Sequence, residues 1–346
     1  MLFATMNNME IKQDRKAALK KIKTLSYSQK VDTESFRKKI EETFSTDYIP
    51  GKVEITEKEF GGVSCSIICP ELFSANRAMI YIHGGNFIAG SRQSWTSFCS
   101  TFATATSTKI ILPEFRLAPE HPFPAQAEDI ENVFKSVLLS EKINLKMNST
   151  DDIDIKEDKE KPEIIIAADS TGASIALSFL LGLDKKYLSE ISKIILLSPI
   201  LEYSFDDATV ALKKLKDEVT NAESIRQCAC MYTYESNISS YSVSPIKAED
   251  SLYEGFPEFY IQCGAKELML PYNKQFELKL ARSGVKCTLD IVEDMMFLFQ
   301  LADESLMEAY ESITRIGDWM NFRGGETKEE IEERKRLIKE NNITVE

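Results

Sequence analysis

Residues 164–173 read IIIAADSTGA, an apolar run that gives way to small residues around Ser170. The run predicts a buried strand, and the small residues predict a sharp turn into a helix. This is the pattern of a serine nucleophile elbow, G-x-S-x-G, with Ala168 in place of its first glycine. Residues beside such a serine must be small, and alanine is the mildest departure from glycine. The alternative interpretation is that Ser170 only caps the start of a helix.

A second small-residue motif, YIHGGNF at residues 81–87, ends a predicted strand. Glycines in such a turn let backbone N–H groups point into a cleft, where they can stabilise a developing oxyanion. A plain turn that contains two glycines is the alternative. The two motifs together are more specific than either alone, because the loop precedes the elbow by two strand–helix units.

Apolar runs recur along the chain, and amphipathic stretches such as Gln126–Leu139 and Asn273–Ser283 lie between them. The runs are Ala78–Ile82, Lys109–Leu112, Glu163–Ala167, Lys193–Leu197, Phe259–Cys263 and Cys287–Val292. Near-continuous hydrophobicity favours strands buried on both faces, and their alternation with helices predicts an α/β fold with a mostly parallel sheet.

Residues 116–125 read RLAPEHPFPA. With the two motifs above, this stretch makes the chain resemble the hormone-sensitive-lipase-like group of α/β-hydrolases over roughly residues 50–320. The resemblance implies an α/β-hydrolase fold with a helical cap over the substrate pocket. It implies an N-terminal cap segment at 1–50, a hydrolase domain at 51–322 and a second cap segment at 205–240. Independently, Phe36, Ile40 and Phe44 after the N-cap Asp32 predict a helix in the first segment.

The resemblance also implies roles for individual residues. Ser170 matches the nucleophile, and Gly84, Gly85 and the N–H of Thr171 match the oxyanion hole. Glu267, in the stretch CGAKEL at 263–268, matches the acid of the triad. For Glu267, an ordinary loop carboxylate is the alternative.

The triad histidine should follow the last strand, yet residues 294–299 read DMMFLF, with Phe297 at the histidine position. The chain has two histidines in all, His83 and His121, and neither is expected to reach Ser170. Removing the histidine of a serine triad costs ~10⁶ in turnover. We expect Glu267, left without its partner, to protonate, to pair with Lys266 or to bind water.

Composition excludes several classes of function. The net charge of −13 argues against nucleic acid and anionic membrane surfaces as partners, and no apolar run is long enough to span a membrane. Seven cysteines, an odd number, favour reduced thiols and a cytoplasmic location. Cys228 and Cys230 lack a second pair of ligands nearby, so we predict no metal and no cofactor. Whether the chain forms a homodimer is left open.

Two charged segments lie outside the strand–helix pattern. Residues 144–162 predict a disordered or exposed insertion. Residues 323–346 contain a capping box, Thr327 with Glu330, and predict a solvated, charged helix or tail.

Three functions follow, in order of preference. The first is a non-catalytic protein that binds a small ester or carboxylate, as the plant gibberellin receptors do, which resemble the same esterases and lack the triad histidine. The second is an active carboxylesterase that uses Ser170 with a non-standard base. The third is an interaction scaffold that uses the insertion or the tail.

Overall fold

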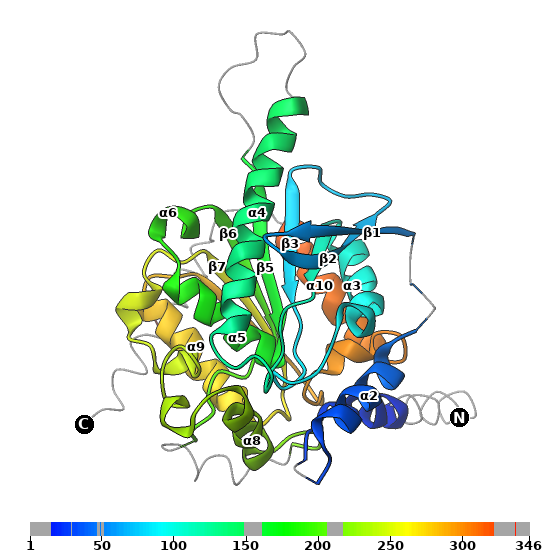
Figure 1. Ribbon diagram of the computed structural model, residues 1–346, viewed down its shortest axis with the longest axis vertical. Helices are drawn as coiled ribbons and strands as arrows, with labels where there is room; N and C mark the ends of the chain where they lie inside the picture. Colours follow the sequence, from blue (N-terminus) through cyan, green and yellow to red (C-terminus); the bar gives the residue numbers. More distant parts are fainter. Residues whose placement is uncertain are drawn as a thin grey trace.

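The computed structural model describes residues 15–28, 30–46, 49, 52–148, 161–205, 217–321 and 336. Its centre is one eight-stranded sheet with the strand order β1-β2-β4-β3-β5-β6-β7-β8 (Figure 1). The strands are β1 (Val53–Phe60), β2 (Val63–Pro70), β3 (Arg77–Ile82), β4 (Lys109–Pro113), β5 (Glu163–Asp169), β6 (Ile191–Leu197), β7 (Glu258–Gly264) and β8 (Cys287–Val292). β1 and β2 pair antiparallel, β2 joins β4 antiparallel, and the other pairs are parallel.

The sheet confirms the predicted fold class and the six predicted strands, and it adds the hairpin β1–β2. β1 escaped prediction because it lies at the edge of the sheet, where its residues 54–59 are exposed and mostly charged. Such charges are common on edge strands, where they discourage pairing with other chains. The Gly61–Gly62 turn between the two strands has positive φ at both residues.

Helices cover both faces of the sheet. α3 (Arg92–Thr106) and α10 (Met307–Asn321) pack together on one face, and α4 (Ala125–Asn148), α5 (Ser170–Gly182) and α9 (Leu270–Arg282) lie on the other (Figure 1). Other elements in the described residues are α2 (Thr33–Phe44), α6 (Lys185–Leu188), α8 (Ala222–Tyr232), η1 (Lys23–Leu25), η2 (Glu235–Asn237), η3 (Pro245–Lys247), η4 (Asp250–Tyr253) and η5 (Phe299–Ala302), and residues 15–22 are also helical. α2 and α8 lie at one end of the molecule, opposite the end at which α4 projects.

α2 forms as predicted. The Asp32 side chain accepts a hydrogen bond from Ser35 N at 2.8 Å, and Phe36, Ile40 and Phe44 are buried.

α4 is longer than the predicted Gln126–Leu139, so residues 144–148 of the expected insertion are helical. Residues 149–160 lie outside the described residues, as does the C-terminal tail apart from Arg336.

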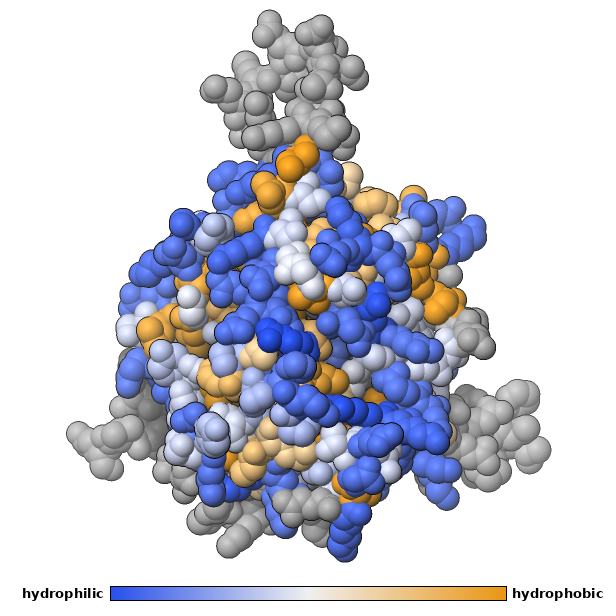
Figure 2. Space-filling model, viewed as in Figure 1, coloured by the Kyte–Doolittle hydropathy of each residue, from blue (hydrophilic) through white to orange (hydrophobic). Residues whose placement is uncertain are grey.

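The surface in Figure 2 is mostly hydrophilic, with hydrophobic residues in small separate groups. One group lies on the projecting part of α4, where Leu139 is 62% and Ile143 is 47% exposed. Within the described residues, no helix is both long and apolar enough to span a membrane.

Candidate functional site

Ser170 lies at the sharp turn from the central strand β5 into α5. Its φ of 49° is in the left-handed region, which a non-glycine residue rarely adopts. A Cβ on Gly172 would lie 2.2 Å from Ile82 O, so the second glycine of the motif is required by the close approach of α5 to β3. Ser170 is buried, and within the described residues its hydroxyl makes no hydrogen bond. The geometry is that of an elbow that presents a serine side chain at the end of a strand.

Residues 83–90, the glycine loop, follow β3 and lie against this turn. A Cβ on Gly84 would approach the Ser170 Cβ to 2.9 Å. Gly84 N donates to Asp169 Oδ1 at 2.9 Å, so this predicted oxyanion donor already has an acceptor within the protein. Gly85 has φ 109° and Asn86 has φ 61°, and their N–H groups have no acceptor among the described residues.

Thr171 follows the nucleophile position at the start of α5. It is buried, and its Oγ1 has no hydrogen-bond partner among the described residues. Its N–H lies in the first turn of the helix, where backbone donors lack an acceptor within the helix. The loop and the start of the helix therefore both contribute potential backbone donors to the region around Ser170.

Asp169 is a site residue that sequence reasoning missed. Its Oδ1 accepts hydrogen bonds from Tyr81 Oη (3.0 Å), Gly84 N (2.9 Å) and Trp95 Nε1 (3.0 Å). Its buried Oδ2 has no partner in the described part of the chain. Complete burial raises the pKa of Asp169 to about 7, and the three donors oppose that rise. The available signal was an acidic residue at the end of an otherwise apolar strand, next to a serine.

Glu267 lies in the loop after β7 and is fully buried. Its Oε1 accepts from Gly264 N at 2.6 Å and from Ser198 Oγ at 2.7 Å, whereas its Oε2 has no partner within the residues that the structure describes. Burial is the largest cause that raises the pKa of Glu267 well above its ordinary value, which favours the protonated form. Lys266 pairs with Asp294 at 2.7 Å instead, so the expected Lys266–Glu267 pair does not form.

The turn that contains Phe297 follows β8 and packs against the Glu267 loop. Met295 O accepts from Lys266 N at 3.1 Å, and a Cβ on Gly264 would come within 2.3 Å of the same oxygen. Leu298 N donates to Ser198 Oγ, which in turn donates to Glu267. Phe297 is buried. The structure thus brings the loop of the predicted acid and the turn of the predicted base position together.

Neither histidine contacts Ser170 by a hydrogen bond within the described residues. His83 is buried, and its ring stacks on Phe115 at 4.3 Å, with Nδ1 2.7 Å from Gly84 O. Because a carbonyl oxygen accepts, Nδ1 must carry the proton. Burial lowers the pKa of His83 and keeps the ring neutral. His121 is exposed. Their positions agree with the expectation that neither serves as base.

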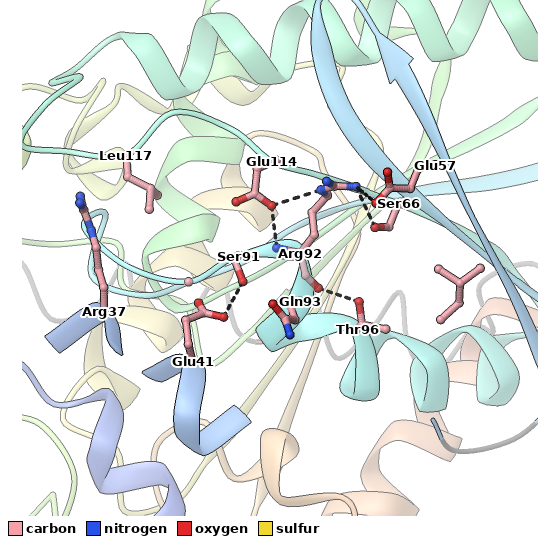
Figure 3. Close-up of a pocket in the computed structure, with 12 residues that line it drawn as sticks. Arg37, Glu41, Glu57, Ser66, Ser91, Arg92, Gln93, Thr96, Glu114 and Leu117 are labelled. Atoms are coloured by element: carbon pink, nitrogen blue, oxygen red, sulfur yellow. Dashed lines mark hydrogen bonds and ion pairs between the residues drawn. The ribbon is translucent and has the colours of Figure 1, made fainter. Parts of the chain in front are cut away.

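A separate pocket of about 700 Å³ lies between α2, the β1–β2 hairpin and the start of α3 (Figure 3). Arg92 crosses it, with Nε 3.2 Å from Glu114 and Nη1 3.1 Å from Glu57. Ser170 and Glu267 do not line it. In the described part of the chain, no cluster of His, Cys, Asp and Glu side chains could hold a metal ion.

Comparisons with known proteins find esterases among the relatives of this chain. An esterase of Acinetobacter venetianus is 27% identical over 247 residues, which cover 71% of this chain and 75% of that protein. Human arylacetamide deacetylase-like 2 is 32% identical over 145 residues, or 41% of this chain and 32% of that protein. The crystal structure of an esterase from the bacterial hormone-sensitive lipase family has a TM-score of 0.74 at 22% identity, covering 89% of this chain and 97% of that one.

A family model described as alpha/beta hydrolase fold matches residues 79–301, well over half of the chain. The glycine loop, the elbow and the Glu267 loop all lie within that range. The resemblance to the hormone-sensitive-lipase-like group is thereby confirmed, and the chain belongs to the α/β-hydrolase fold family.

Proposed function

We propose that this esterase- and lipase-type α/β-hydrolase binds a small molecule bearing an acyl or carboxylate group at Ser170, and that its capacity for ester cleavage is impaired. The observation that carries the proposal is the orphaned Oε2 of Glu267. In a serine triad the acid accepts a hydrogen bond from the histidine that activates the serine. Here the turn beside Glu267 offers Phe297, which has neither a ring N–H to donate nor a lone pair to accept the serine proton.

Binding does not need that base. The N–H groups of Gly85 and Asn86, with the N–H of Thr171 at the start of α5, are suited to hold a carbonyl or carboxylate oxygen. α2 and α8 would form the cap over the Ser170 site, since both reach the glycine loop. Tyr232 of α8 stacks on Phe87 with ring centroids 3.9 Å apart. All seven cysteines are free thiols, which supports a reducing, cytoplasmic compartment for the protein.

An active carboxylesterase is the second candidate. It is favoured by the left-handed φ of Ser170 and by relatives named esterases. It requires a base of another kind, since within the described residues neither histidine is hydrogen-bonded to Ser170.

Two measurements separate these candidates. A bound ester or carboxylate should raise the temperature at which the chain unfolds. At a ligand concentration of 100 times the dissociation constant, the gain in stability is about 2.7 kcal/mol. The unmodified chain should hydrolyse short p-nitrophenyl esters no faster than the Ser170→Ala variant does. The Phe297→His variant should hydrolyse them faster than both. Turnover by the unmodified chain well above that of Ser170→Ala would favour the active esterase instead.

A further inference from the structure

Helix α2 is bonded directly to the glycine loop through Arg37. Its Nε donates to Ile88 O at 2.6 Å, and its Nη2 donates to Ala118 O at 2.8 Å. The outer side of the same guanidinium forms two hydrogen bonds with the Glu120 carboxylate, at 3.0 and 2.6 Å. The donors of a guanidinium form a rigid, planar fork. Through this fork, Arg37 joins two separate loops, one at Ile88 and one at Ala118.

The two carbonyl acceptors of Arg37 belong to segments that also pair with each other. Ala118 N donates to Phe87 O at 3.0 Å, so residues 87–88 and 118 form a small junction. Within the loop, Ile88 N and Ala89 N both donate to Gly85 O. Arg37 closes this junction from the side of α2.

The glycine loop needs such support because of its backbone. Asn86 and Phe87 are non-glycine residues at φ 61° and 66°, a conformation that persists only when the surroundings hold it. Asn86 has a second tie, since its Nδ2 donates to Leu25 O at 2.7 Å in the segment before α2. The N–H groups without acceptors, those of Gly85 and Asn86, lie in this same loop.

A third contact fixes the far end of the loop to α2. Glu41, one turn after Arg37, accepts from Ser91 Oγ at 2.9 Å and from Ser94 Oγ at 3.1 Å at the start of α3. Figure 3 shows Arg37 and Glu41 on α2, with Glu41 directed to Ser91.

We propose that Arg37 is a positioning residue: from α2, its guanidinium fork holds the glycine loop in the conformation that presents the Gly85 and Asn86 N–H groups beside Ser170. The purpose assigned to the loop rests on the proposed function. The positioning itself is a property of the chain without ligand and is tested there.

The test is native-state hydrogen exchange of the full chain without ligand, followed at the amides of Ile88, Ala89 and Ala118. In Arg37→Lys, which keeps the charge but loses the planar fork, we expect these amides to exchange about tenfold faster or more. In Glu120→Gln, which leaves both carbonyl contacts in place, the acceleration should stay below about threefold. Arg282→Lys, which alters a distant arginine–carboxylate pair with Asp250, is the matched control and should change none of them.

Two results would overturn the proposal. Wild-type exchange in Arg37→Lys would mean that a positive charge suffices. Equal acceleration of the β6 amides would mean that Arg37 only contributes to global stability. Failure to find an acyl ligand would count against the proposed function and leave this measurement unaffected.

Discussion

The protonation of Asp169 gives a quantitative prediction for Asp169→Asn. The pKa of Asp169 rises from 3.8 to about 7 on folding because the carboxyl is fully buried. A carboxyl whose pKa is higher in the folded chain binds its proton more tightly there. Its contribution to stability is therefore complete below the unfolded pKa and is lost as the pH rises through about 7. With these two pKa values, the loss between about pH 5.5 and about pH 8 is about 2 kcal/mol.

The variant removes this titration and keeps the shape of the side chain. Asparagine retains an acceptor oxygen for Tyr81, Gly84 and Trp95. Its uncharged amide nitrogen takes the place of Oδ2, which has no partner among the described residues. Because other titrating groups are present in both proteins, their effects cancel in the difference.

The assay is urea unfolding of both proteins across that pH range. The stability of the wild type minus that of Asp169→Asn should fall by about 2 kcal/mol from about pH 5.5 to about pH 8. Parallel pH profiles would refute the reasoning, because they would mean that Asp169 titrates at the same pH in the folded and unfolded chains.

Three further changes test the site by urea unfolding. Gly172→Ala should lower the free energy of unfolding by about 2 kcal/mol, because the new Cβ lies 2.2 Å from the last carbonyl oxygen of β3. Gly182→Ala in the same helix is the control and should lower it by none, because its Cβ has no atom of the described residues within 4 Å. Tyr81→Phe should cost about 2 kcal/mol at about pH 8 and less at about pH 5.5, because a protonated Asp169 accepts weaker hydrogen bonds. Glu267→Gln should leave stability at about pH 7 unchanged or raise it, since burial already favours the neutral acid; a loss above about 2 kcal/mol would indicate an ionised Glu267.

Much of the fold could be predicted because its signals are local. β8 is Cys287–Val292 in the sequence pattern and in the structure, and α2 begins at its predicted cap. The contacts around the site are of another kind. Trp95 lies 74 residues from the carboxylate that it contacts, and Arg37 lies 51 and 81 residues from its two carbonyl acceptors. No periodicity links such positions in the sequence. The roles of Asp169 and Arg37 can therefore be identified only from the folded structure.

These contacts also limit what the motif residues around Ser170 indicate about function. Gly172 is required by the packing of α5 on β3, and Gly84 is required by its approach to Asp169 and Ser170. Asp169 in turn holds Gly84 and Trp95. A chain that had lost all chemistry would still need these residues to fold, so their presence does not indicate retained catalysis. The Ser170 hydroxyl differs, because it makes no hydrogen bond among the described residues. We therefore expect Ser170→Ala to leave stability within about 0.5 kcal/mol, and a binding or turnover defect in that variant would report on function alone.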